Sequence, residues 1–138
     1  MNAYARTSNL AAYQNAAAHG GVAASDPHGL VVMLMDGALE RIAMARGAMQ
    51  RNDVTEKARL LNRTVSIVAE LRGSLDLSAG GQIAANLSEL YDYMNRRLML
   101  ALANNQIEPL DEVSKLLTEI RSAWVAIPPQ SRTRKVGP

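Results

Sequence analysis

The sequence predicts an all-α fold, an antiparallel up-down four-helix bundle with an additional short N-terminal helix. Good helix formers dominate the apolar fraction of 48%, whereas Phe is absent and Trp occurs once. Apolar residues recur at alternating three- and four-residue steps, as on one face of a helix. The predicted connections are only a few residues long, and short connections place successive helices antiparallel.

The first predicted helix begins at Asp26-Pro27 and runs to about residue 51. Asp caps free backbone N–H groups, and Pro suits the first helical position. The second helix follows Asn52-Asp53 and ends near Asp76, before Gly80-Gly81, where a left-handed stop is available. The apolar seam of the first helix is Val31, Met35, Ala38, Ile42, Ala45 and Met49. The second helix carries Ala58, Leu61, Val65 and Val68 on one seam, with Leu60, Ile67, Leu71 and Leu75 beside it.

The third predicted helix ends around Asn104-Asn105, and the fourth begins near Pro109 and ends before Pro128-Pro129. Their apolar seams are Ile83, Leu87, Leu90, Met94, Leu98 and Ala101, and Leu110, Val113, Leu117, Ile120, Trp124 and Ile127.

A length of 138 residues fits one domain. We expect a single helical-bundle domain over residues 1–127, in which residues 1–25 are a loosely attached N-terminal segment, and a disordered basic tail over 128–138. The tail carries Arg132, Arg134 and Lys135, so the net charge of +2 is weak support for nucleic-acid binding. No apolar run approaches the roughly 18 residues of a membrane span, and no secretory signal is recognisable. These features predict a cytoplasmic protein that neither inserts into membranes nor binds nucleic acid.

Residues with catalytic or metal-binding chemistry are scarce. There is no Cys, and neither His19 nor His28 is preceded by Glu three residues earlier, as a di-iron bundle requires. We interpret both histidines as solvated residues at a loop or helix start. Gly80-Gly81 lacks the Lys-Ser/Thr of a phosphate-binding loop. The sequence therefore predicts no enzyme activity, no metal and no cofactor.

Two segments carry more apolar residues than one core can cover. One is the unbroken run from Leu30 to Met35, and the other contains Leu98, Met99, Leu100 and Leu102. A bundle helix needs about three apolar positions in seven. The excess is explained equally well by packing against the N-terminal helix or a homodimer partner, or by a groove for another protein's amphipathic segment.

Several stretches together resemble one family, the flagellin-specific flagellar export chaperones of the FliS type, over roughly residues 10–127. They are Ala12-Tyr13-Gln14, Ser25-Asp26-Pro27-His28-Gly29-Leu30, Met33-Leu34-Met35-Asp36-Gly37-Ala38-Leu39, Ile67-Val68-Ala69-Glu70-Leu71, Ser74-Leu75-Asp76, Gly80-Gly81-Gln82-Ile83-Ala84-Ala85-Asn86-Leu87, Leu90-Tyr91-Asp92-Tyr93-Met94, Arg96-Arg97-Leu98, Glu112-Val113 and Ile120-Arg121-Ser122-Ala123-Trp124.

The resemblance implies an antiparallel bundle in the bacterial cytosol that binds the disordered C-terminal segment of newly made flagellin. Such chaperones prevent premature polymerisation and help to deliver flagellin to the export gate, so a gate component is a second candidate partner. Their N-terminal segment can lie over part of the same surface. At the position of Met35 the family often has an aromatic residue, which puts only the local packing in question.

The candidate protein-binding residues are Leu10, Tyr13, Leu30, Met33, Leu34, Tyr91, Met99 and Leu102. Tyr91 and Tyr93 lie about 200° apart on a helix, so only one of them can seal the core. Leu98 continues the seam of the third helix, whereas Met99 faces outward. Two other functions stay open. One is a structural helical homodimer, whose association can be weak, and the other is a small regulatory binding protein.

Overall fold

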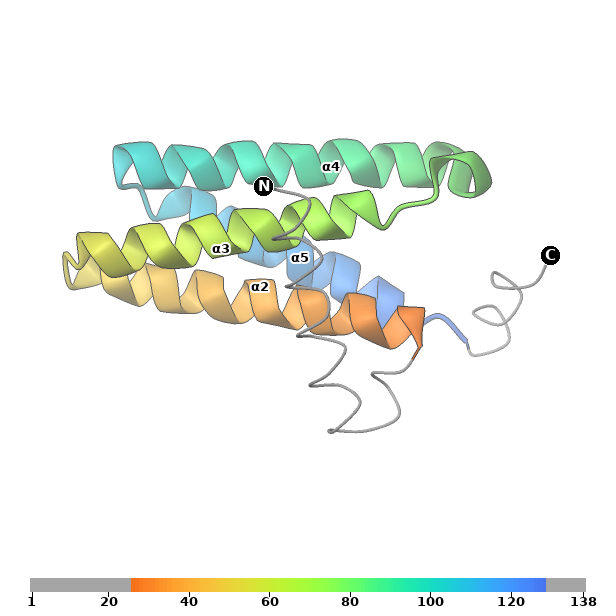
Figure 1. The fold of residues 1–138 in the computed structure, drawn as a ribbon, viewed down its shortest axis with the longest axis horizontal. Helices are drawn as coiled ribbons and strands as arrows, with labels where there is room; N and C mark the ends of the chain where they lie inside the picture. Colours follow the sequence, from red (N-terminus) through yellow and green to blue (C-terminus); the bar gives the residue numbers. More distant parts are fainter. Residues whose placement is uncertain (1–25, 129–138) are drawn as a thin grey trace.

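The computed structural model describes residues 26–128, which form four α-helices and no strand (Figure 1). Connections of three residues join the helices, at 51–53, 74–76 and 105–107. The four predicted helices are confirmed. The predicted N-terminal helix, residues 1–25, and the tail beyond residue 128 lie outside the described part of the chain. The helices are α2 (Pro27–Gln50), α3 (Val54–Gly73), α4 (Leu77–Asn104) and α5 (Glu108–Val125).

Contacts between helices show that the bundle is antiparallel. Between α2 and α5, His28 contacts Trp124 and Arg46 pairs with Asp111, so rising numbers on one helix meet falling numbers on the other. Between α3 and α4, the same order holds for Val65 with Asn95 and for residue 57 with residue 102. The four helices thus surround one core, and α5 returns to lie beside α2 (Figure 1).

The core consists of the predicted apolar seams. Met35 is fully buried, so Met fills this position of the core without an exposed atom. A fully buried side chain of this size stabilises the fold by about 1.5–3 kcal/mol relative to an exposed one. Thr64 is also fully buried, and its hydroxyl donates to the carbonyl of Leu60 at 2.8 Å. The largest fully buried apolar side chains are Met35, Leu61, Ile67, Leu71, Met94, Leu98, Leu110, Leu117, Val68 and Val113.

Aspartates cap three of the helices. Asp26 accepts from the backbone N–H of Gly29 at the start of α2, as the sequence predicted. Asp53 caps α3 by the same geometry. Asp76 caps α4 by accepting from the backbone N–H of Ala79 at 3.0 Å. This bond, with that from the Ser78 hydroxyl, lowers the pKa of Asp76. Each such cap stabilises its helix by about 1 kcal/mol.

The prediction for the end of the second helix was wrong. It was expected near Asp76 with Gly80-Gly81 as the stop, but α3 ends at Gly73 and the glycine pair lies inside α4. Gly81 has φ 55° and ψ −137°, which kinks α4 after its first turn. The capping carboxylate of Asp76 begins a new helix, so the glycine bends this helix instead of ending the previous one.

One position of the predicted α4 seam is not in the core. Ile83 is 75% exposed, whereas Met94, Leu98 and Ala101 are fully buried. The start of α4 projects past the end of α3 in Figure 1, so α3 does not cover the first turns of α4. The predicted spacing of the buried residues of α4 was therefore correct, but the buried seam does not extend back to Ile83.

Candidate protein-binding surface

The predicted binding residues fall into three groups. Leu10 and Tyr13 lie outside the described residues. Leu34 and Tyr91 are each only 3% exposed. Leu34 belongs to the face of α2 that packs into the core, and Tyr91 takes the inward position of the tyrosine pair. Both side chains therefore belong to the core of residues 26–128, and their contact with a partner stays a prediction.

The other four residues remain accessible. Leu30, Met33 and Leu102 are half-buried, and Met99 is 48% exposed beside the fully buried Leu98. Leu30 and Met33 lie near the start of α2, whereas Met99 and Leu102 lie near the end of α4. In an antiparallel bundle these two places are in opposite halves, so the four residues do not form one patch.

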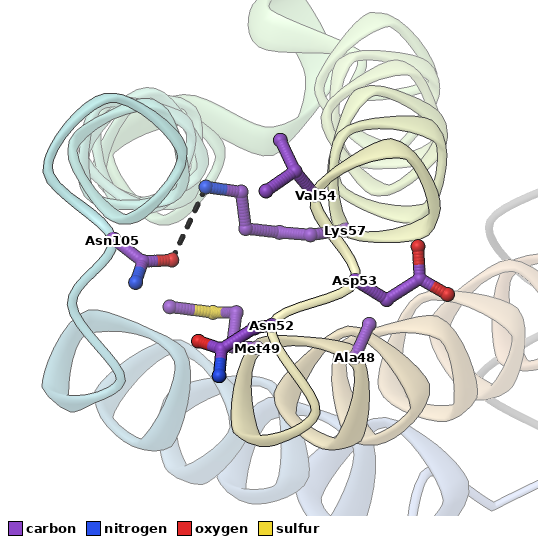
Figure 2. A pocket seen from close by; sticks show the side chains of 7 residues that line it. All are labelled: Ala48, Met49, Asn52, Asp53, Val54, Lys57 and Asn105. Atoms are coloured by element: carbon purple, nitrogen blue, oxygen red, sulfur yellow. Dashed lines mark hydrogen bonds between the residues drawn. The ribbon is translucent and has the colours of Figure 1, made fainter.

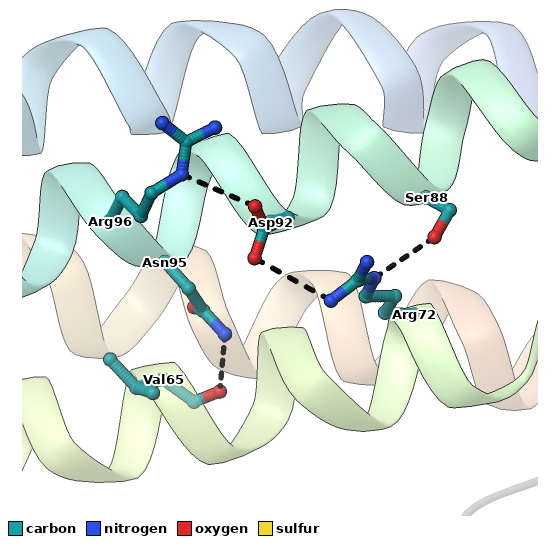
Figure 3. Close-up of polar contacts among 6 residues, drawn as sticks. All are labelled: Val65, Arg72, Ser88, Asp92, Asn95 and Arg96. Carbon is teal, nitrogen blue, oxygen red and sulfur yellow. Dashed lines mark hydrogen bonds and ion pairs between the residues drawn. The ribbon is translucent and has the colours of Figure 1, made fainter.

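One face of the bundle is formed by α3 and α4, with Val65 and Arg72 of α3 and Asp92 and Asn95 of α4 (Figure 3). Met99 follows Asn95 by four residues and so lies on the same side of α4. We call these five residues the α3–α4 face. Arg72 donates to Ser88 at 2.9 Å and pairs with Asp92 at 3.5 Å, and Asp92 also pairs with Arg96 at 3.2 Å. These exposed pairs contribute little stability each, about 0–1 kcal/mol. They leave Met99, one turn after Asn95, as the exposed apolar side chain of the face.

Asn95 has an incomplete set of hydrogen bonds. Its Nδ2 donates to the carbonyl of Val65 at 3.2 Å, across the helix boundary (Figure 3). Its Oδ1 is buried without a hydrogen-bond partner among the described residues. The sequence analysis did not identify this residue, because an Asn inside a helix carries no signal for the neighbour that it will face.

A polar cluster joins α4 to α5. The Tyr93 hydroxyl donates to Glu112 at 2.6 Å, and Arg97 pairs with the same carboxylate at 2.7 Å. These bonds, with that from Tyr93 the stronger, lower the pKa of Glu112, and the bond to Glu112 raises the pKa of Tyr93. Arg96 lies over the Tyr93 ring at 5.7 Å from the centroid. Tyr93 is thus the outer tyrosine of the predicted pair.

His28 is not the solvated histidine that the sequence predicted. It lies in the first turn of α2, as expected, but its ring stacks on Trp124 with centroids 4.9 Å apart. Both side chains are half-buried. The contact joins the start of α2 to the end of α5, so both residues position helices.

The described part of the chain offers no place for a metal or a membrane span. Residues 26–128 contain no group of three or more His, Asp or Glu arranged to hold a metal ion. Within the same residues, none of the helices combines the length and apolarity needed to cross a membrane. The described residues thus form a closed helical-bundle module with accessible apolar side chains in both halves.

Comparison with known proteins identifies the kind of module. The family described as flagellar protein FliS matches residues 9–131, and the chain belongs to this family. The chain is 44% identical to flagellar secretion chaperone FliSB of Pseudomonas aeruginosa over 115 residues, which cover 83% of this chain and 91% of that protein. It is 39% identical to flagellar secretion chaperone FliS of Salmonella typhimurium over 125 residues, covering 90% and 93%.

A more distant relative gives the same result. Flagellar secretion chaperone FliS of Bacillus subtilis is 34% identical over 98 residues, covering 71% of this chain and 72% of that protein. The chain is therefore a member of a flagellar chaperone family and not an enzyme, and the resemblance drawn from the sequence is confirmed.

Proposed function

We propose that the chain is a cytosolic flagellar export chaperone that binds the disordered C-terminal segment of flagellin. It keeps the bound flagellin from polymerising prematurely and aids its delivery to the flagellar type III export apparatus. The observation that carries the proposal is the family match over residues 9–131, with secretion chaperones as relatives at 44% and 39% identity.

The distribution of accessible apolar residues supports a long client. Leu30 and Met33 lie in one half of the bundle and Met99 and Leu102 in the other, so one compact ligand does not touch all four. A disordered segment can wrap a large surface, because it orders only on binding. Its ordering entropy must be offset by apolar contacts along its length. Exposed Met side chains such as Met99 adapt to different client sequences.

The proposed chaperone domain covers residues 1–127. The N-terminal segment with Leu10 and Tyr13 either covers part of the client surface or contacts a component of the export gate. The second role adds a partner, whereas the first makes this segment a competitor of flagellin. A Tyr13→Ala variant separates the two roles. If the segment competes with flagellin, the variant binds flagellin equally or more tightly. If the segment contacts the export gate, flagellin affinity is unchanged and only export is impaired.

Calorimetry tests the proposal with the full chain and a synthetic peptide of the flagellin C-terminal segment. We expect one-to-one binding at micromolar concentration that is unchanged by a chelator or by nucleotide. A peptide of the same composition in scrambled order is the control and releases no heat. Absence of heat, together with absence of co-elution in size-exclusion chromatography, rejects the proposal.

A further inference from the structure

A small cavity lies where the connection 51–53 meets the connection 105–107 (Figure 2), and we call it the end pocket. It has a volume of about 240 Å³ and is lined by Ala48, Met49, Asn52, Asp53, Val54, Lys57 and Asn105. Pockets for small molecules have volumes of about 300–1,000 Å³. The end pocket is smaller, and its size suits a single side chain of a partner.

Lys57 is the one basic residue that lines the end pocket, and Asp53 is the one acidic residue. Lys57 is only 8% exposed, and its Nζ donates to the carbonyl of Leu102 at 3.3 Å and to Oδ1 of Asn105 at 3.2 Å. Both acceptors are uncharged, whereas an ammonium group has three N–H donors. Within residues 26–128, Lys57 forms no ion pair. Because buried lysines are normally paired, this charge favours an anionic ligand.

The nearest acidic residue does not supply the missing charge. The carboxylate of Asp53 points away from Nζ of Lys57 (Figure 2). It accepts from the backbone N–H of Glu56 at 3.1 Å, as the cap of α3. The carboxylate of Glu56 is in turn paired with Arg59. The carboxylate of Asp53 is therefore directed to the start of α3, and neither it nor Glu56 forms an ion pair with Lys57.

Two asparagines add donors at the rim. Asn52 has φ 60° and Asn105 has φ 54°, and no other non-glycine residue in the described part of the chain has a positive φ. Asn tolerates this conformation better than most residues. Because Oδ1 of Asn105 accepts from Lys57, the Nδ2 of that amide remains as a donor. Val54, which is 67% exposed, gives the rim an apolar side.

We propose that the end pocket binds the carboxylate of an acidic side chain in a partner protein. Lys57 supplies the cation, the amides of Asn52 and Asn105 supply further donors, and Val54 contacts an apolar residue adjacent to the acidic one. Charge-assisted hydrogen bonds of this kind are about twice as strong as neutral ones. This site goes beyond the proposed function, since it does not depend on flagellin as the client.

Nuclear magnetic resonance on the isotope-labelled full chain tests the proposal. The probe is the peptide acetyl-Leu-Glu-Leu-amide, and its matched control has Gln in place of Glu. We expect saturable shifts of the backbone amides of Asn52, Val54 and Asn105, with binding about tenfold weaker for the Gln peptide. A third peptide, acetyl-Leu-Gln-Leu with a free terminal carboxylate, binds like the Gln amide. Equal binding of the first two peptides, absent shifts, or tightest binding of the third overturns the proposal.

Two variants test whether the preference for the Glu peptide arises at the end pocket. Lys57→Met keeps a long side chain and removes the charge, so the preference for Glu over Gln is expected to disappear. Lys115→Met, at an exposed position on α5, is the matched control and keeps the preference. A folded Lys57→Met protein that still prefers Glu contradicts the proposal, as does a Lys115→Met protein that loses the preference.

A second variant covers the case in which Lys57→Met does not fold. Asn52→Gly removes one amide donor and retains the backbone, because Gly adopts positive φ freely. We expect the Glu peptide to bind this variant about threefold more weakly. Unchanged affinity would count against the site.

Discussion

The side chains of His28 and Trp124 hold each other's main chains by reciprocal hydrogen bonds. Nε2 of His28 donates to the carbonyl of Trp124 at 2.6 Å, and Nε1 of Trp124 donates to the carbonyl of His28 at 3.1 Å. Their rings are nearly parallel, with 11° between the planes. The pair connects the first turn of α2 to the last turn of α5, so it closes the ring of helices.

Removing the indole should separate packing from hydrogen bonding in this pair. We expect Trp124→Ala to lower the free energy of unfolding by about 2–3 kcal/mol, because it removes stacking, burial and one donor. Trp124→Phe keeps a stacked ring without the N–H, and it should cost about 1 kcal/mol. Urea denaturation followed by circular dichroism measures both. Equal losses for the two variants would show that stacking contributes nothing.

A negative charge should destabilise the fold strongly at one residue of α4 and hardly at all at the next. Leu98 is fully buried, so Leu98→Glu should lower the free energy of unfolding by about 3 kcal/mol or more. Met99 is 48% exposed, so Met99→Glu should change it by less than about 0.5 kcal/mol. If Met99 contacts flagellin, the same change should weaken binding of the flagellin peptide about tenfold in calorimetry. A folded Met99→Glu protein with normal binding would exclude the α3–α4 face as client surface.

Tyr91 should make stability fall at alkaline pH. Burial raises the pKa of Tyr91 to about 12, above the ordinary value of 10.0. A raised pKa favours the protonated hydroxyl in the folded state, so this contribution is complete below pH 10.0 and is lost as the pH rises toward about 12. By linkage it amounts to roughly 2–3 kcal/mol. Urea denaturation at several alkaline pH values checks this, and Tyr91→Phe should remove most of the dependence. An unchanged slope in Tyr91→Phe would assign the effect to other groups.

Two glycines should differ in their tolerance of Ala. Gly81 has φ 55°, and an added Cβ there meets no atom within 4 Å, so Gly81→Ala should destabilise by about 1–2 kcal/mol through backbone strain alone. Gly47 lies inside α2 with only the flexible end of Arg51 near its Cβ position. Gly47→Ala should therefore stabilise by up to about 1 kcal/mol. Thermal denaturation of the pair gives the comparison. A stabilised Gly81→Ala protein would mean that α4 straightens without cost.

Local sequence signals predicted most of the fold. The capping chemistry of Asp26-Pro27 and the helix stop at Asn104-Asn105 act over a few residues, and both lie where they were expected. The end of the second helix was not predictable in this way. Asp76 is able to follow one helix or to begin the next, and only the capping bond to Ala79 distinguishes these roles.

The surface was harder to predict than the core. The periodic pattern gave the inward face of α4, but it could not show that α4 starts beyond its neighbour and leaves Ile83 exposed. The contact of His28 with Trp124 joins residues 96 positions apart, and no local pattern reports such a contact. The predicted seam of the second helix began at Ala58 and left Lys57 out, although Lys57 precedes Leu61 by four residues and so shares its helix face. A lysine at a seam position predicts a buried ammonium group.

The antiparallel ring has a consequence for the order of folding. Four pairs of neighbouring helices are in contact around the ring. Three of these pairs are helical hairpins with connections of three residues, which form quickly because their loops are short. The contact between α2 and α5 joins residues 65, 85 and 96 positions apart, so its closure carries the largest loop entropy. Its ion pairs, Asp36 with Arg121 and Arg46 with Asp111, are solvent-exposed and add little. We therefore expect this contact to form last and to open first, and its opening would admit water to the core while the hairpins stay intact.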